Sequence, residues 1–234
     1  MPKIKLFSDG ADKKTMLEMA SNPSVSGLTT NPTLMRKAGI TDYVSFAKEV
    51  LSVIKDKPIS FEVFADDFVS MEKQALEIAG WGKNVYVKIP ITNTEGQATQ
   101  ALIKKLSHSA VQLNVTALLT LDQVVSTCEA LKGGAPSVVS VFAGRVADTG
   151  VDPVPLMAAS AALCEYYDKK IELLWASSRE VLNIMQAEQA GCHIITVTPD
   201  LLKKLSMLGK NLTTLSLETV RMFKTDADAA GFSL

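Results

Sequence analysis

Short apolar runs that alternate with longer segments of helical apolar spacing limit the fold of this chain more than any other feature of its sequence. Eight such runs are rich in β-branched and aromatic residues, and a segment with helical periodicity follows each of them. This order is typical of a parallel sheet whose faces are covered by helices. The predicted strands are Ile4–Phe7, Val25–Leu28, Ile59–Val63, Val85–Ile89, Val111–Val115, Val138–Val141, Ile171–Leu174 and Ile194–Val197.

The number of strands decides between two parallel architectures. Eight strands joined by helical crossovers favour a (β/α)8 TIM barrel of the α/β class, because a doubly wound open sheet more often has five or six strands. The chain has 234 residues and no low-complexity linker, so we expect one domain over residues 1–234. The predicted helices are Asp12–Ala20, Tyr43–Ile54, Val69–Ala79, Glu95–Leu106, Leu121–Leu131, Val154–Tyr167, Val181–Ala190 and Asp200–Leu208.

An additional C-terminal helix is predicted over residues 212–231, after the last strand. Its apolar positions include Leu215, Val220, Met222 and Phe223. Because no strand is left for it to cover, we expect it to pack across the barrel or onto another subunit.

The overall charge excludes two classes of partner. The formal net charge is −1, so no long-range field favours nucleic acid or an anionic membrane surface. The N-terminal apolar run is too short for a signal peptide, and no stretch reaches the roughly 18 apolar residues that a membrane span needs. We therefore expect a cytoplasmic protein with a small-molecule partner.

The cysteines and histidines have no metal-binding pattern. Cys128, Cys164 and Cys192 lie far apart without CxxC spacing, and we interpret them as reduced core residues. His108 and His193 lack the paired spacing of a metal or acid–base site. The sequence therefore predicts no metal ligands.

Polar residues gather where the predicted strands end. In a barrel, the carboxyl ends of all strands converge on one mouth, where active sites lie. Taken singly, Thr30 and Asn31 before Pro32 are also explained as a helix cap, and Asp9 before Gly10 as a turn residue. The polar residues of the strand ends are Asp9, Thr29, Thr30, Asn31, Glu62, Lys88, Asn114, Thr116, Ser140, Arg145, Ser177 and Arg179.

Lys88 is the most unusual of these residues, because it lies in the otherwise apolar segment VYVKIP. Side chains alternate between the faces of a strand, so if Val85, Val87 and Ile89 pack against helices, Lys88 points into the barrel. A lysine on an edge strand ended by Pro90 is the alternative, but a closed barrel has no edge strand. Burial disfavours the charged ammonium and favours the free amine, which can form a Schiff base with a carbonyl substrate.

Two arginines near the ends of neighbouring strands suit a phosphate group. Arg145 follows the sixth strand, and Arg179 follows the seventh together with Ser177. Barrels often bind phosphate near their last strands, and arginine forms paired hydrogen bonds with it. Surface salt bridges are the alternative explanation of either arginine alone.

Several motifs in the same order resemble the transaldolase family, specifically its short-chain branch of transaldolases and fructose-6-phosphate aldolases. The resemblance extends over almost the whole chain, and the motifs are specific together although none is specific alone. They are LTTNPTL (28–34), VKIP with Lys88, LNVTALLT (113–120), SVFAGRVADTG (140–150), ASSR (176–179) and GCHIITVTPDLLKKL (191–205).

The resemblance implies a class I mechanism that needs neither metal nor cofactor. Lys88 would attack the ketone of sedoheptulose 7-phosphate or fructose 6-phosphate and hold a dihydroxyacetone unit as an imine. The unit would pass to erythrose 4-phosphate or glyceraldehyde 3-phosphate, in the pentose phosphate pathway. Asp9 would act as acid and base for the hydroxyl group at the cleaved bond, and Glu62 and Thr116 would hold a proton-relaying water.

The resemblance also implies contacts with the rest of the substrate. Asn31 and Asn114 would bind its hydroxyls or the imine region, and Ser140 would contact the dihydroxyacetone hydroxyl. Thr30 would lie in the same polar shell. The phosphate would be bound by Arg145, Ser177 and Arg179.

Two positions distinguish the activities within this branch. Transaldolases resemble one another in having Glu and Phe where this chain has Glu62 and Phe142, whereas fructose-6-phosphate aldolases have Gln and Tyr. The pair indicates a transaldolase. The alternatives are an aldolase that releases dihydroxyacetone and a non-catalytic sugar-phosphate-binding barrel, although the latter would need only the arginines and Ser177.

The segment WASSR departs from the commoner wording of the family. Trp175 and Ser178 flank Ala176 and Ser177 where a small and an apolar residue are more usual. An indole two residues before Ser177 is large enough to reshape a phosphate pocket. Relatives in the branch form pentameric rings stacked into decamers, so the resemblance also implies a homo-oligomer.

Overall fold

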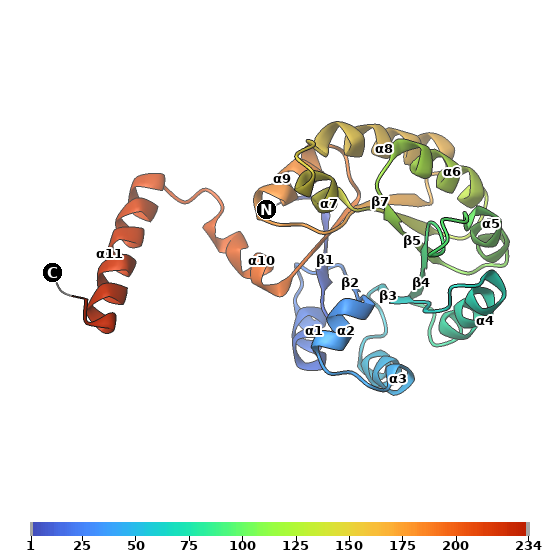
Figure 1. Cartoon of the computed structure of the whole chain (residues 1–234), viewed down its shortest axis with the longest axis horizontal. Coiled ribbons are helices and arrows are strands. Elements are labelled where there is room, and N and C mark those ends of the chain that lie inside the picture. The colour runs from blue at the N-terminus through green and yellow to red at the C-terminus, as the bar shows by residue number, and fades with distance from the viewer. Residues whose placement is uncertain (1, 233–234) are drawn as a thin grey trace. The chain divides into compact units, whose positions relative to one another are not determined.

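The predicted TIM barrel is confirmed by the computed structural model, which describes residues 2–232. Its eight parallel strands follow one another around the barrel in chain order, and the last pairs with the first (Figure 1). No edge strand is therefore left in the described barrel. The strands are β1 (Lys5–Asp9), β2 (Gly27–Thr29), β3 (Ile59–Glu62), β4 (Val85–Pro90), β5 (Leu113–Leu118), β6 (Ser137–Val141), β7 (Ile171–Trp175) and β8 (Ile194–Val197).

Helices surround the barrel, and side-chain caps fix where several of them begin. Asp12, Asp42, Asp67 and Thr120 each accept a hydrogen bond from a backbone N–H in the first helical turn. The helical segments are α1 (Lys13–Ser21), α2 (Pro32–Lys37), α3 (Tyr43–Val53), α4 (Phe68–Ala79), α5 (Gln100–His108), α6 (Leu121–Leu131), α7 (Ala143–Asp148), α8 (Val154–Tyr167), α9 (Leu182–Gln189), α10 (Pro199–Lys203), the 3-10 segment η1 (Lys204–Met207) and α11 (Leu212–Ala230).

The helix predicted over residues 95–106 begins later, at Gln100. Asn93 accepts a hydrogen bond from the backbone N–H of Gln97 at 2.8 Å, which closes a local turn instead of a helical turn. Gly96 lies within this turn with a φ of 77°, in the left-handed region. Apolar spacing alone does not reveal such a turn.

Other parts of the structure also differ from the sequence prediction. The strand predicted over residues 111–115 lies further along the chain, at Leu113–Leu118. The helix predicted over residues 200–208 is divided between α10 and η1. The short helices α2 and α7 were not predicted, because each has only six residues and follows a strand directly.

By their internal contacts the residues form two compact units, one up to Leu202 and one from Lys203 onward. The first unit contains the complete barrel. The second contains α11, which confirms the predicted additional helix. Asn211 caps its start, and Gly231 ends it with a left-handed φ of 67°. None of the residues of α11 is buried.

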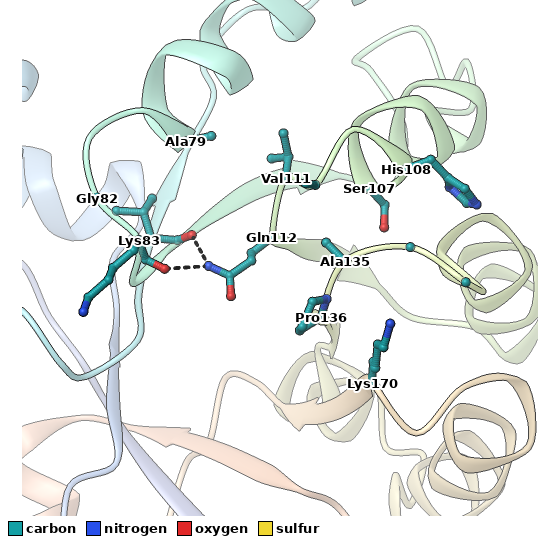
Figure 2. A pocket seen from close by; sticks show the side chains of 14 residues that line it. Ala79, Gly82, Lys83, Ser107, His108, Val111, Gln112, Ala135, Pro136 and Lys170 are labelled. Atoms are coloured by element: carbon teal, nitrogen blue, oxygen red, sulfur yellow. Dashed lines mark hydrogen bonds between the residues drawn. The ribbon is translucent and has the colours of Figure 1, made fainter.

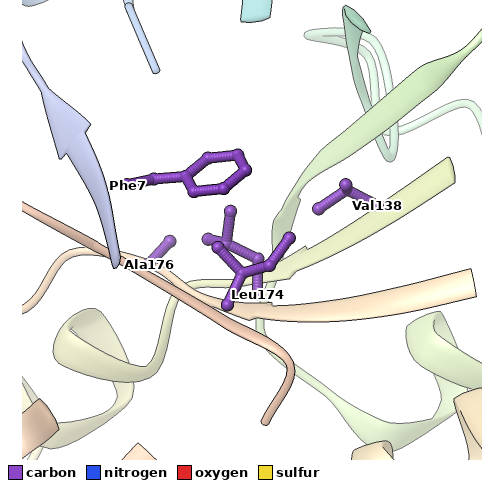
Figure 3. Packing of buried hydrophobic residues seen from close by; sticks show 5 residues of the cluster. Phe7, Val138, Leu174 and Ala176 are labelled. Atoms are coloured by element: carbon purple, nitrogen blue, oxygen red, sulfur yellow. The ribbon is translucent and has the colours of Figure 1, made fainter. Parts of the chain in front are cut away.

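An apolar layer of buried side chains packs inside the barrel (Figure 3). Tyr86 and Phe142 pack against this layer. A Cβ atom at Gly27 would lie 2.5 Å from the ring of Phe7, so only glycine leaves room for that ring. The layer consists of Phe7, Val138, Leu174, Ala176 and Ile194.

The strand register places three polar residues side by side on neighbouring strands. Glu62 is paired with Lys88 across β3 and β4, and Lys88 is paired with Asn114 across β4 and β5. Residues in register on parallel strands point to the same face. The barrel therefore directs all three side chains toward its interior.

Candidate functional site

A cavity of about 220 Å³ opens at the carboxyl ends of the strands. Nine of the predicted site residues line this cavity, and they come from six different strand ends, as expected for the functional end of a barrel. Leu174 and Ala176 form its apolar side. The polar and aromatic residues that line it are Asp9, Thr29, Asn31, Thr33, Lys88, Asn114, Thr116, Ser140, Phe142, Arg145, Ser177 and Thr196.

The Lys88 amine is held by two oxygen atoms inside the barrel. Its Nζ lies 3.2 Å from Oε2 of Glu62 and donates a hydrogen bond to the carbonyl oxygen of Thr30 at 2.8 Å. Lys88 is only 7% exposed. A buried amine with one face toward a cavity is suited to attack a carbonyl carbon.

Asp9 lies across the cavity at the end of β1 and accepts a hydrogen bond from Thr29 Oγ1 at 2.8 Å. Thr29 Oγ1 also lies 2.6 Å from Thr196 Oγ1. Since the single Thr29 proton goes to Asp9, Thr196 donates to Thr29. Burial raises the pKa of Asp9 above its ordinary value, opposed by the charge of Lys88 and the Thr29 bond. A carboxyl group with a raised pKa takes up and returns a proton more readily at higher pH than an ordinary aspartate does.

Asn114 is fixed by hydroxyl groups on both sides. Its Nδ2 donates to Ser60 Oγ at 3.0 Å, and its Oδ1 accepts from Ser140 Oγ at 2.6 Å. One N–H of the amide and the lone pairs of Ser140 are thus left for a ligand. The arrangement is a rigid polar belt across β3, β5 and β6.

The Thr116 hydroxyl is different, because it is buried and has no hydrogen-bond partner among the described residues. Thr116 lines the cavity and precedes Ala117, which has a φ of 65° at a shift of register between β5 and β6. Such irregularities re-aim side chains, often beside active sites. An unpartnered hydroxyl in a polar cavity can hold a water molecule or a substrate oxygen.

Thr30 and Asn31 have structural contacts in addition to their place beside the site. Thr30 Oγ1 donates to the Ser60 carbonyl at 2.8 Å, and the Thr30 side chain does not line the cavity. Asn31 lines the cavity, and its Oδ1 caps α2 by accepting from Leu34 N–H at 2.9 Å. The amide nitrogen of Asn31 is therefore the group that remains for a ligand.

Arg145 lies at the rim of the cavity, with its guanidinium carbon 5.4 Å from the centre of the Phe142 ring. This stacking orients the charge without neutralising it. Ser177 lines the same side with a φ of 60°. A Cβ atom at Gly144 would lie 1.6 Å from the Ser177 carbonyl oxygen, so glycine is required for α7 to approach Ser177.

Arg179 is placed outside the cavity lining. Its side chain is half exposed and forms an ion pair with Asp148 at the end of α7. This contact is the surface salt bridge that the sequence left open as an alternative. Trp175 is fully buried and points to the face of β7 opposite Leu174 and Ala176, so its indole does not line the cavity.

Four residues of the site were given no role in the sequence interpretation. Thr29 and Thr196 hold Asp9, Ser60 holds Asn114, and Tyr43 binds the backbone of Glu62. Thr29 lies on β2 beside Asp9 of β1, and Ser60 lies on β3, which pairs with the Lys88 strand β4. The inward alternation of side chains along β2 and β3 was the signal available for both residues. Tyr43 starts a helix, and no periodicity points to its contact.

A second cavity of about 600 Å³ lies at the opposite end of the barrel, beside the starts of β4 to β7 (Figure 2). Gln112 donates hydrogen bonds to the carbonyl groups of Lys83 and Val85 there, at 2.9 and 3.3 Å. None of the predicted site residues lines this cavity. It therefore has no part in the chemistry of the carboxyl mouth.

The described residues contain no group of three or more metal-ligating side chains that could hold an ion. Cys128, Cys164 and Cys192 are free and buried. Across residues 2–232, none of the helices combines the length and apolar character that crossing a membrane requires.

The sequence profile described as Transaldolase/Fructose-6-phosphate aldolase matches residues 6–234. The chain belongs to this family. A buried lysine and two carboxyl groups beside a cavity of about 220 Å³ at the barrel mouth are consistent with a family of aldolase- and transaldolase-type enzymes.

Named relatives of this transaldolase/aldolase family member match most of its length. A probable transaldolase from Thermoanaerobacter sp. is 33% identical over 231 residues, which are 99% of this chain and 100% of the relative. One from Dehalococcoides mccartyi is 37% identical over 194 residues, 83% of this chain and 86% of the relative. One from Brucella anthropi is 34% identical over 216 residues, 92% and 94% of the two chains.

A more distant solved structure shares the fold of this family member. It is described as a putative lyase/mutase from Burkholderia cenocepacia J2315 and has a TM-score of 0.63. The match covers 99% of this chain and 85% of the other, at 13% sequence identity. This likeness shows the fold alone.

The raised pKa of Asp9 predicts that this family member is less stable than its Asp9→Asn variant at neutral pH. Above the ordinary carboxyl pKa of 3.8, the folded protein binds the Asp9 proton more tightly than the unfolded chain does. Stability therefore falls as pH rises through the window between the two pKa values. We expect the variant to have a larger unfolding free energy than the parent at pH 7.5, and the difference to vanish near pH 3.5.

Urea unfolding at the two pH values measures this difference. Asp12→Asn serves as the matched control, because hydrogen bonds from Thr15 lower the pKa of Asp12. The control should lose stability at pH 7.5. Equal stability of the parent and Asp9→Asn at pH 7.5 would show that burial does not raise the pKa of Asp9.

Proposed function

We propose that this protein is a transaldolase that transfers a dihydroxyacetone unit from a ketose phosphate to an aldose phosphate. The observation that carries the proposal is the Lys88 amine, buried between Glu62 and the Thr30 carbonyl in the cavity that Asp9 also lines. The donor is sedoheptulose 7-phosphate or fructose 6-phosphate. The acceptor is erythrose 4-phosphate or glyceraldehyde 3-phosphate.

In the first step, the Lys88 ammonium gives a proton to the Glu62 carboxylate, and the free amine attacks the C2 carbonyl carbon of the donor. The carbinolamine loses the former carbonyl oxygen as water and becomes a protonated imine bound to Nζ. A water held between Glu62 and the unpartnered Thr116 hydroxyl would carry the protons that this dehydration requires. Glu62 is within ion-pair distance of Nζ and also stabilises the positive charge of the imine.

In the second step, Asp9 removes the proton from the C4 hydroxyl group. The C3–C4 bond breaks, its electron pair moves into the imine to give an enamine, and the aldose phosphate leaves. The acceptor aldehyde then binds, the enamine carbon attacks it, and Asp9 returns the proton to the new hydroxyl. Water finally hydrolyses the new imine, which releases the product ketose phosphate and restores the Lys88 amine. The desolvated Asp9 carboxyl is suited to both directions, because its raised pKa brings it closer to neutral pH.

The remaining polar groups would bind the parts of the substrate that do not react. Ser140, Asn114 and Asn31 would contact the hydroxyls of the dihydroxyacetone unit. Arg145 and Ser177 would bind the phosphate at the rim. Arg179 would join them only after releasing Asp148. The chemistry uses side chains of this chain and calls for no cofactor, and we propose that it takes place in the cytoplasm.

The named relatives support transfer over simple cleavage, since each is called a probable transaldolase. Phe142 supports the same choice, because it lines the cavity without a hydroxyl group. A tyrosine there would bring a proton donor to the enamine, and protonation of the enamine releases dihydroxyacetone instead of retaining it for an acceptor.

We further propose that the protein acts as a homo-oligomer, with α11 packed on another subunit. Val220, Met222 and Phe223 of this helix are each at least half exposed. Helices with such apolar side chains usually cover another surface. Light scattering should give a mass of several times the 25.2 kDa of one chain, and a monomeric mass would contradict this proposal.

The proposed transfer is tested with fructose 6-phosphate and erythrose 4-phosphate, by measuring glyceraldehyde 3-phosphate and sedoheptulose 7-phosphate. We expect both products in equal amounts from the parent. Lys88→Met should lose roughly 10³-fold or more of the rate while remaining folded, because the covalent nucleophile is gone. A parent that binds fructose 6-phosphate but forms no product would indicate a non-catalytic barrel.

Phe142→Tyr tests why the enamine is retained. We expect the variant to release free dihydroxyacetone from fructose 6-phosphate without an acceptor, at roughly tenfold or more above the parent, as general acid catalysis allows. Phe142→Leu lacks the hydroxyl group and is the matched control. No gain in dihydroxyacetone release by Phe142→Tyr over Phe142→Leu would refute this explanation.

A further inference from the structure

Tyr43 binds both backbone groups of Glu62 with its single hydroxyl. Tyr43 Oη accepts a hydrogen bond from the Glu62 N–H at 2.8 Å and donates one to the Glu62 carbonyl oxygen at 3.0 Å. Glu62 is the last residue of β3, and its carboxylate lies 3.2 Å from Lys88 Nζ. The Tyr43 phenol therefore fixes the backbone of Glu62, and the Glu62 carboxylate in turn contacts Lys88.

The ladder between β2 and β3 explains why Glu62 needs this partner. In a parallel ladder, Leu28 N–H donates to Pro58 O and Thr30 N–H donates to Ser60 O, at 2.8 and 3.3 Å. Continued by the same rule, the Glu62 N–H would donate to the Thr30 carbonyl, and the Glu62 carbonyl would accept from the N–H of residue 32.

Neither of these two hydrogen bonds forms in the described part of the structure. Residue 32 is Pro32, which has no N–H group. The Thr30 carbonyl instead accepts the hydrogen bond of Lys88 Nζ at 2.8 Å. The Tyr43 hydroxyl replaces both missing partners, since a phenol can donate one hydrogen bond and accept another. It thereby satisfies two backbone groups at a half-buried strand end. Without a hydrogen-bond partner, each of these groups would lower the free energy of unfolding.

The ring of Tyr43 is itself fixed. Tyr43 is the first residue of α3, whose start is capped by Asp42. Its ring makes edge contacts with Phe61, Phe64 and Trp81, at centroid distances of 6.1, 4.5 and 5.6 Å. Burial raises the pKa of Tyr43, so the hydroxyl keeps its proton and remains a donor throughout the working pH range.

We propose that Tyr43 is a positioning residue for the Schiff-base lysine, which keeps the Glu62 carboxylate in place and the Thr30 carbonyl free to accept from Lys88. The expected effect of Tyr43 on the rate rests on the proposed function, whereas its expected effect on the geometry does not. Without the hydroxyl, the Glu62 N–H would turn to the Thr30 carbonyl oxygen, which would then have to accept from both Glu62 and Lys88 and would shift both groups. A misplacement of about 1 Å near a reacting group can lower the rate by up to about 10²-fold.

The test compares two variants of the full-length protein, Tyr43→Phe and Trp81→Phe. Tyr43→Phe removes only the hydroxyl, whereas Trp81→Phe loosens the same aromatic cluster and leaves the hydroxyl in place. We expect Tyr43→Phe to lower kcat of the transfer reaction roughly 10- to 100-fold with KM within about twofold of the parent. Trp81→Phe should retain the parental kcat.

Crystal structures of both variants separate this inference from the proposed function. In Tyr43→Phe, we expect Lys88 Nζ to lie beyond about 3.5 Å from Thr30 O or to lose its contact with Glu62. Unmoved contacts overturn the inference, as does an unchanged kcat when the parent is active. A parent without transfer activity refutes the proposed function, and displaced contacts in Tyr43→Phe then still uphold the positioning role.

Discussion

The site depends on one contact, the approach of the Lys88 amine to the Glu62 carboxylate inside a closed barrel. An isolated ammonium in this position would be expensive, because burial removes its hydration. Glu62 and the Thr30 carbonyl replace that hydration with two oxygen atoms at fixed distances. The strand register that pairs Glu62 with Lys88 is therefore also what makes a buried lysine tolerable.

The two carboxyl groups of the site have opposite surroundings. Glu62 is paired with Lys88, whereas Asp9 is desolvated at the end of β1 and has a raised pKa. Different environments allow two carboxyl groups to take different roles in one reaction. Glu62 is suited to stabilise positive charge at the lysine, and Asp9 to exchange a proton with the substrate.

Strand alternation predicted the direction in which Lys88 points, and the number of strands predicted the barrel. The inward direction of Lys88 follows from the apolar residues at positions 85, 87 and 89, and the barrel follows from the count of strands. What sequence spacing did not reveal depends on contacts between distant segments. Tyr43 lies 19 residues before Glu62 on another element, and Thr196 is 167 residues from Thr29.

The arginines show a second limit of prediction from sequence. Arg145 and Arg179 each follow a strand, yet one lies over Phe142 at the cavity and the other pairs with Asp148 outside its lining. Which of the two faces the cavity depends on the path of α7 and on the close approach of Gly144 to Ser177, neither of which has a periodic pattern. The start of α5 also differs from the prediction, because the local turn at Asn93 has no periodic pattern in the sequence.

The central claim is that Lys88 reacts covalently with a ketose phosphate. The most direct measurement is borohydride reduction of the protein with fructose 6-phosphate, followed by peptide mass analysis. The account predicts a stable adduct on the peptide that contains Lys88, and none on the other lysines or in Lys88→Met. Transfer of the dihydroxyacetone unit without any adduct on Lys88 would contradict the account.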